Sequence, residues 1–203
     1  GNGTDYRCTI SDAAPGQISL VVHDEAPSST EPGVACRVYM AFSKAEKFEH
    51  VVQKATELGA CEIIAFPSSR CVAKPEEKSL SKKLERWQKI AASAAEQSGR
   101  GRIPTVRAAK SFREAVLEAS TCDLPLFPYE NEKTLPLSAC LKEHSYRTVS
   151  IMTGPEGGFS EDEVAFAGEN NMNICSLGPR ILRCETAPLC ALTAVLFAAG
   201  ALD

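Results

Sequence analysis

The sequence has few of the features that mark a membrane, metal-binding or secreted protein. It contains only three histidines, and its nine cysteines are never spaced as C-x-x-C. Zinc sites need Cys and His ligands at short, regular spacings, so we expect no metal. The longest apolar run, residues 191–202, is shorter than the ~20 residues of a membrane span, and no signal peptide is indicated. Nine thiols without a disulfide pattern favour reduced cysteines and a cytoplasmic location.

The common nucleotide-binding and hydrolase motifs are absent as well. Neither G-x-G-x-x-G nor G-x-x-x-x-G-K-[ST] occurs, and no Ser, Cys or His stands in a nucleophile-elbow context. These absences argue against an oxidoreductase with a nucleotide cofactor, a nucleoside triphosphatase and a serine hydrolase.

Charge is unevenly distributed along the 203 residues. The whole chain carries −4, which argues against indiscriminate binding of polyanions, yet residues 78–113 hold ten Lys or Arg against two Glu. Such a patch is typical of a surface that binds phosphates, although a solvated helix face explains it equally well. Helical spacing places Lys82, Arg86 and Lys89 on one face, and Arg100 and Arg102 flank a glycine where the helix ends.

Hydrophobic periodicity predicts alternating strands and helices. We expect strands at 17–23, 36–42, 61–67, 105–108, 124–129, 149–153 and 174–177, and helices at 44–58, 79–98, from 111, at 136–143, from 160 and at 185–199. Ser160 and Glu163 form an S-x-x-E capping box that starts the second-last helix. This alternation is typical of an α/β fold with a mostly parallel sheet, and a change in composition near Val34 suggests a domain boundary.

Two apolar runs near the C-terminal end each lead into a Gly-Pro loop. The first Gly-Pro loop, residues 154–159, reads GPEGGF, and the second, residues 178–183, reads GPRILR. Glycines after a strand let the backbone approach a ligand closely, so two such loops suggest one composite pocket. Simple tight turns are the alternative that the glycines alone leave open.

Four longer stretches carry a more specific signal. They read KFEHVVQKATELGACEIIAFPSSRCVAK (47–74), RWQKIAASAAEQSGRGRIPTV (86–106), GPEGGFSEDEV (154–164) and SLGPRILRCETAPLCAL (176–192). In order and spacing they resemble the RsmE-type 16S rRNA uridine N3-methyltransferases of the SPOUT superfamily. The resemblance implies a trefoil-knotted α/β methyltransferase domain that binds S-adenosyl-L-methionine (SAM) and releases S-adenosyl-L-homocysteine. It also implies methylation of one uridine in the small ribosomal subunit, a homodimer, and an N-terminal PUA-like β-barrel that helps to hold RNA.

The resemblance assigns residues of this sequence to a SAM pocket, and basic residues are the candidates for contacts with RNA. The SAM pocket would comprise a strand end and both Gly-Pro loops: Leu126, Phe127, Tyr129, Thr153, Gly154, Pro155, Glu156, Gly157, Gly158, Leu177, Gly178, Ile181 and Leu182. RNA contacts would come from Arg70, Lys82, Arg86, Lys89, Arg100 and Arg102. Leu177 and Leu182 equally suit plain core packing.

The methyl transfer that the resemblance implies requires few catalytic groups from the protein. SAM carries an activated methyl group, so no metal or covalent nucleophile is required. As the imide proton leaves uracil N3, negative charge spreads onto O2 and O4, and fixed cationic donors stabilise it. We expect Arg183 first and Arg180 second in that role, with Glu156 or Glu185 accepting the proton. Glu185 equally suits the first turn of the last helix, and alignment without a dedicated base is a further option.

The N-terminal residues depart from the family pattern. Residues 1–12 resemble an internal hairpin of the barrel whose first strands are missing. We therefore divide the chain into a partial PUA-like barrel (1–34) and a SPOUT domain (35–203), and expect residues 1–35 to be disordered or rearranged, with weakened RNA binding. Cys184 and Pro188 also differ from the usual family pattern. A non-catalytic SPOUT-like RNA-binding or ribosome assembly factor is the alternative function, against which Arg183 and the intact glycines argue.

Overall fold

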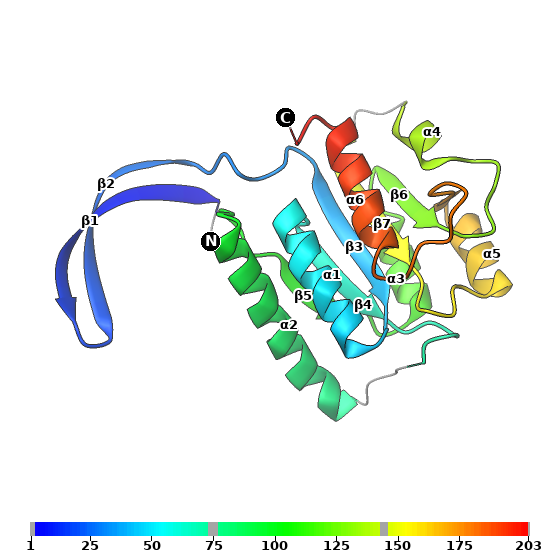
Figure 1. Cartoon of the computed structure of the whole chain (residues 1–203), viewed down its shortest axis with the longest axis horizontal. Coiled ribbons are helices and arrows are strands. Elements are labelled where there is room, and N and C mark those ends of the chain that lie inside the picture. Colours follow the sequence, from blue (N-terminus) through cyan, green and yellow to red (C-terminus); the bar gives the residue numbers. More distant parts are fainter. Residues whose placement is uncertain (1–2, 73–76, 143–145, 203) are drawn as a thin grey trace.

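A parallel β-sheet forms the centre of the computed structural model, which describes residues 3–72, 77–142 and 146–202 (Figure 1). Within these residues six strands pair in the order β5-β4-β3-β7-β6-β8, every pair parallel. The strands are β3 Ala35–Ala41, β4 Glu62–Phe66, β5 Thr105–Ala108, β6 Leu124–Pro128, β7 Thr148–Thr153 and β8 Asn173–Cys175. The structure therefore confirms the predicted α/β fold.

Helices cover both faces of this sheet and create two apolar cores. One core joins the sheet to α1 (Ala45–Leu58), α2 (Glu77–Gln97) and α6 (Ala187–Ala198) and also includes α4 (Leu137–Leu141). The other core joins it to α3 (Phe112–Ala119) and α5 (Glu161–Glu169). Side chains alternate along a strand, so Val38 and Met40 of β3 enter the first core and Tyr39 enters the second.

Local chemistry sets the ends of several helices as predicted. At the start of α5, the Ser160 hydroxyl accepts a hydrogen bond from the Glu163 N–H, and the Glu163 carboxylate accepts one from the Ser160 N–H at 3.0 Å. Gly59 ends α1 with a φ of 112°, a left-handed conformation that costs a glycine little. Pro188 lies in the first turn of α6, where its missing N–H needs no partner.

The N-terminal residues form a long antiparallel hairpin of β1 (Thr4–Ala14) and β2 (Gln17–Pro27), which extends away from the sheet domain (Figure 1). Its apolar side chains are largely in solvent; Ile10 is 62% exposed and Leu20 is 55% exposed. We expected disorder or rearrangement here, and the structure has regular strands, although the described residues 3–34 form no closed barrel. The assignment of 1–34 to a PUA-like barrel stays a prediction.

Arg100 anchors the base of this hairpin, and the expectation that it contacts RNA is corrected by its position. Its side chain is only 3% exposed and pairs with Glu31, Nη2 lying 2.6 Å from Oε2. Its Nη1 donates to the carbonyl oxygens of Thr56 (2.9 Å) and Ala60 (2.8 Å) at the end of α1. A guanidinium that is buried and bonded in this way is not available to a phosphate.

Two further observations concern membranes and metals. Among the helices that the structure describes, none is both long and apolar enough to cross a bilayer. The same described residues contain no group of three or more His, Cys, Asp or Glu side chains arranged to hold a metal ion. All nine cysteines are free thiols.

Candidate active site

A cavity of about 510 Å³ lies where β6, β7 and β8 end at the carboxyl edge of the sheet. Three segments line it, together with Lys47 and Ala187: residues 128–130 at the end of β6, 153–159 at the end of β7 and 176–184 after β8. Ligands of parallel α/β sheets bind at this edge. The two Gly-Pro loops thus share one cavity, as their sequence pattern predicted.

Two glycines of the cavity lining, Gly158 and Gly178, have positive φ angles. Gly158 has a φ of 66°, and a Cβ there would collide with the carboxylate of Glu130. Gly178 has a φ of 102°, and a Cβ there would meet no atom within 4 Å because the position faces open space. Buried Phe159 packs against Phe127 with ring centroids 4.3 Å apart, which fixes the end of the first loop to the sheet.

Most of the predicted cofactor residues line this cavity. They are Tyr129, Thr153, Gly154, Pro155, Glu156, Gly157, Gly158, Leu177, Gly178, Ile181 and Leu182. Leu126 and Phe127 do not line it, because both are fully buried in the cores on either side of β6. These two side chains support the wall of the cavity, and their assignment to the cofactor site stays a prediction.

Both candidate catalytic arginines, Arg180 and Arg183, belong to the lining of the cavity and are exposed. Within the described part of the chain, neither guanidinium has a hydrogen-bond or ion-pair partner. The Arg183 carbonyl accepts hydrogen bonds from the N–H groups of Thr186 (2.9 Å) and Ala187 (3.0 Å), so its backbone is held at the start of α6. Arg183 thus combines a fixed backbone with a side chain that is free to meet an anion.

The third candidate, Glu156, is tied to α1. Its Oε1 accepts a hydrogen bond from the Lys44 N–H (3.3 Å) and lies 3.4 Å from Lys47 Nζ. Partial burial opposes ionisation of Glu156, but backbone hydrogen bonds and the charge of Lys47 outweigh it, so its pKa lies below the usual value. Glu156 is therefore a carboxylate at neutral pH and a weak proton acceptor.

Sequence reasoning missed Lys47, although it lines the cavity and contacts both Gly-Pro loop regions. Its Nζ lies 3.4 Å from Glu185 Oε2 and donates to Cys184 Sγ at 3.7 Å. One signal was present in the sequence. Lys47 follows β3 closely, and the carboxyl ends of parallel strands meet at the same edge of the sheet.

The remaining RNA candidates lie on the surface. Lys82, Arg86 and Lys89 are exposed along α2, and Arg86 Nη2 pairs with Glu49 at 2.7 Å. Arg70 is exposed beside the first Gly-Pro loop and donates to the Gly157 carbonyl at 3.2 Å. Arg102, exposed at the hairpin base, completes the set. Apart from buried Arg100, the predicted residues are thus accessible.

Comparison with known proteins gives a consistent result. A model of the RNA methyltransferase domain family matches residues 30–196. The chain is 36% identical over 203 residues to ribosomal RNA small subunit methyltransferase E of Bacillus subtilis (strain 168). The alignment covers 97% of this chain and 78% of that protein.

Solved structures agree with this match. A ribosomal RNA small subunit methyltransferase E from Neisseria gonorrhoeae, bound to S-adenosyl methionine, superimposes with a TM-score of 0.85 at 30% identity, covering 96% of this chain and 78% of that chain. A methyltransferase from Legionella pneumophila in complex with SAM gives a TM-score of 0.84 at 29% identity, covering 98% and 80%. The fold is that of a SPOUT-type RNA methyltransferase. The chain belongs to the ribosomal RNA small subunit methyltransferase E family.

Proposed function

We propose that this protein transfers the methyl group of SAM to N3 of a uridine in 16S rRNA of the small ribosomal subunit. The observation that carries the proposal is the single cavity formed by both Gly-Pro loops, with two unpaired arginines at its edge. Family membership supports the rRNA substrate, because the curated relatives are named for that activity. Since ribosomes are cytoplasmic, the activity also implies a cytoplasmic location.

The residues that line the cavity fit SAM. Gly178 leaves open space where other residues carry a Cβ, so its backbone can approach a ligand directly. Leu177, Ile181 and Leu182 supply apolar walls, while backbone N–H and C=O groups of both loops supply polar contacts. A cavity of about 510 Å³ with mixed lining is typical of small-molecule sites. When bound, SAM supplies an electrophilic methyl group.

Arg183 is our candidate for stabilising the uracil. Its guanidinium is uncommitted, and its backbone is fixed at the start of α6. Donors aimed at O2 and O4 would stabilise the charge that develops as the N3 proton leaves, and Arg180 is the second donor on the same loop. Glu156, already ionised and paired with Lys47, is a weak base. We therefore expect the N3 proton to leave to water that Glu156 orients.

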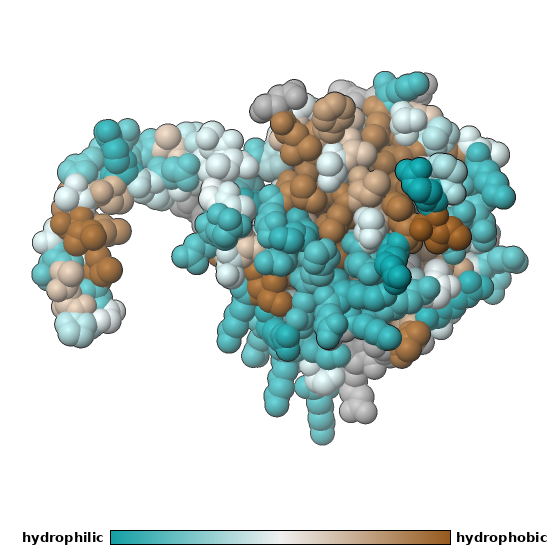
Figure 2. Space-filling model, in the orientation of Figure 1, coloured by the Kyte–Doolittle hydropathy of each residue, from teal (hydrophilic) through white to brown (hydrophobic). Residues whose placement is uncertain are grey.

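Basic residues outside the cavity are proposed to hold the RNA. Lys82, Arg86 and Lys89 share the exposed face of α2, while Arg70 and Arg102 lie near the first Gly-Pro loop and the hairpin base. Figure 2 shows hydrophilic side chains gathered over α2. Long cationic side chains of this kind bind phosphates without sequence preference. They would position an RNA strand on the protein without recognising its bases.

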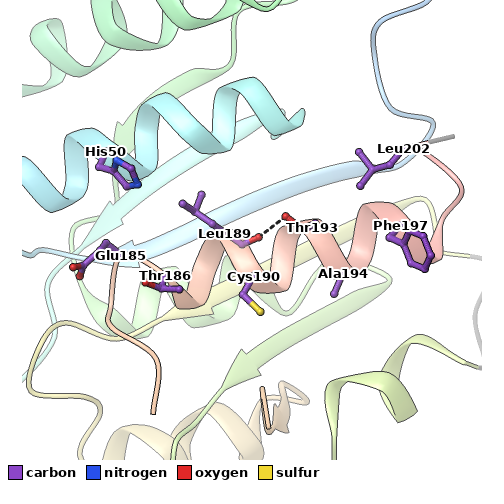
Figure 3. Close-up of a pocket in the computed structure, with 9 residues that line it drawn as sticks. All are labelled: His50, Glu185, Thr186, Leu189, Cys190, Thr193, Ala194, Phe197 and Leu202. Carbon is purple, nitrogen blue, oxygen red and sulfur yellow. Dashed lines mark hydrogen bonds between the residues drawn. The ribbon is translucent and has the colours of Figure 1, made fainter. Parts of the chain in front are cut away.

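We also propose a homodimer whose interface is the exposed face of α6. A shallow hollow of about 640 Å³ lies between α1 and α6, lined by His50, Glu185, Thr186, Leu189, Cys190, Thr193, Ala194, Phe197 and Leu202 (Figure 3). Phe197 is 71% exposed, and apolar residues gather over this helix in Figure 2. A helix that is apolar on all sides is normally buried. Because Glu185 also contacts Lys47, a second copy seated here would adjoin the cavity.

A non-catalytic assembly factor is the competing function. It shares the RNA-binding surface but does not transfer a methyl group. Incubation of small ribosomal subunits that lack the modification with methyl-labelled SAM separates the two, with Arg183→Ala as the variant. We expect the label in rRNA with the wild type and at least a ~100-fold slower transfer with the variant. SAM binding without transfer by the wild type would favour the assembly factor.

A further inference from the structure

The ammonium group of Lys47, at the cavity, joins three segments that are distant in the sequence. Lys47 extends from the first turn of α1, and its Nζ lies 3.4 Å from Glu156 Oε1 in the first Gly-Pro loop. The same atom lies 3.4 Å from Glu185 Oε2, two residues after the second loop. It also donates a hydrogen bond to Cys184 Sγ at 3.7 Å. All these contacts are intramolecular, so Lys47 acts on the loops before any ligand arrives.

In the cluster of Lys47, Glu156 and Glu185, Lys47 supplies the positive charge that both carboxylates need. Two carboxylates share one ammonium, and the side chains of Lys47, Glu156 and Glu185 are only 24%, 21% and 23% exposed. Without Lys47, Glu156 would keep the Lys44 N–H and Glu185 the Cys184 thiol as donors, but no cation would separate the two carboxylates. At this burial like charges are poorly screened, so the carboxylates would repel each other and separate the loops. The same Glu156 Oε1 also accepts a hydrogen bond from the Lys44 N–H at 3.3 Å, so Glu156 would stay tied to α1, and the segment of Glu185 is the part expected to move.

Movement of Glu185 would change the position of Arg183, the candidate donor to the uracil. Arg183 precedes it by two residues, and the Arg183 carbonyl is held by the first N–H groups of α6. These hydrogen bonds join Arg183 to Thr186 on the other side of Glu185, so a displacement of Glu185 would also displace Arg183. A shift of a reactive group by about 1 Å can cost two orders of magnitude in rate.

We propose that Lys47 is a positioning residue that holds the two Gly-Pro loops together, and so sets the width of the cavity and the place of Arg183. This inference rests on the proposed function and deepens it. Lys47 itself is saturated by two carboxylates and a thiol, so it does not contact RNA or the reacting atoms.

Several titratable groups surround this cluster, and each contributes to the pH dependence of stability. They are Lys47 and His50 of α1, Tyr129 and Glu130 after β6, Glu156 of the first loop, and Arg180, Arg183, Cys184 and Glu185 of the second loop region. All except Lys47 are common to wild type and the single variant Lys47→Met, so differences between these two proteins report on Lys47.

The test compares Lys47→Met, Lys47→Arg and the double variant Lys47→Met/Glu185→Gln with wild type. Lys54→Met is the matched control. Lys54 lies on the same helix, its Nζ is 2.8 Å from Glu57 Oε1, and neither residue lines the cavity. Calorimetry with SAM gives affinity, methyl transfer gives kcat and KM, and thermal unfolding without SAM from pH 4 to pH 8 gives a readout independent of activity.

We expect Lys47→Met to bind SAM about tenfold more weakly and to lose kcat as well, while Lys47→Arg and Lys54→Met stay within about threefold of wild type. The Lys47→Met deficit in unfolding temperature should shrink as the pH falls and the two carboxylates become protonated. Removing one carboxylate in the double variant should restore most of the affinity, which loss of packing alone would not do.

Other outcomes overturn the inference. Lys47→Met within twofold of wild type would show that the ion pairs do not position the loops. A deficit that is independent of pH and not relieved by Glu185→Gln would assign Lys47 a packing role. If wild type itself binds no SAM, the proposed function fails, and the unfolding comparison of the unliganded proteins still decides the role of Lys47.

Discussion

Replacing Arg100 by Gln should lower the free energy of unfolding by about 3–5 kcal/mol, the usual cost of removing one partner of a buried ion pair. The Arg100 side chain is 3% exposed and that of Glu31 is 19% exposed, so the carboxylate left behind cannot be fully hydrated. The carbonyl oxygens of Thr56 and Ala60 would each lose a donor as well. Arg86→Gln is the control, because that side chain is 69% exposed and its pair with Glu49 is worth only ~0–1 kcal/mol.

Urea unfolding followed by tryptophan fluorescence measures both variants. Trp87 is the single tryptophan, 3% exposed and packed on Phe48 with ring centroids 4.3 Å apart, so its emission reports the core between α1 and α2. Limited proteolysis should also cut the β1–β2 hairpin faster in Arg100→Gln, since its anchor is lost. A loss below 1 kcal/mol together with weaker RNA binding would refute this reasoning and return Arg100 to the RNA-binding surface.

Three further predictions test other parts of the account. Burial raises the pKa of Glu163 and hydrogen bonds from Ser160 and Ser69 lower it, with a net decrease from the usual 4.5. Wild type should therefore lose this stabilisation as the pH falls below that usual value, whereas Glu163→Gln should start about 1–3 kcal/mol less stable at pH 7 and change less with acid. Gly158→Ala should displace Glu130 and weaken SAM binding about tenfold by calorimetry, and unchanged affinity would contradict the role given to that turn. Phe197→Asp should convert a dimer to a monomer in light scattering, and a monomeric wild type would refute the α6 interface.

Local and periodic features were predictable from the sequence. The alternation of apolar runs predicted the parallel sheet, and S-x-x-E predicted the start of α5 at Glu161. Both Gly-Pro loops follow strands, so the parallel topology brings them to one edge and into one cavity. These features depend on neighbours in sequence or on the rule that parallel strands end together.

Features that depend on tertiary distance were not predictable. Arg100 and Arg102 look alike in sequence, yet only the Arg100 side chain pairs with Glu31 and bonds to the end of α1, whereas Arg102 reaches Glu31 through its backbone N–H alone. Lys47 acquires its role from Glu156 and Glu185, which approach it only in the folded chain. Charge along the sequence shows where cations are but not which of them are already neutralised.

The identity of the methylated nucleoside tests the central claim most directly. Small ribosomal subunits lacking the modification are incubated with the protein and isotopically labelled SAM, and the rRNA is digested to nucleosides for mass analysis. The account predicts label in N3-methyluridine, lost in Arg183→Ala with SAM binding retained. Label in a ribose-methylated nucleoside, in a uridine methylated at carbon, or in no nucleoside despite SAM binding would contradict it.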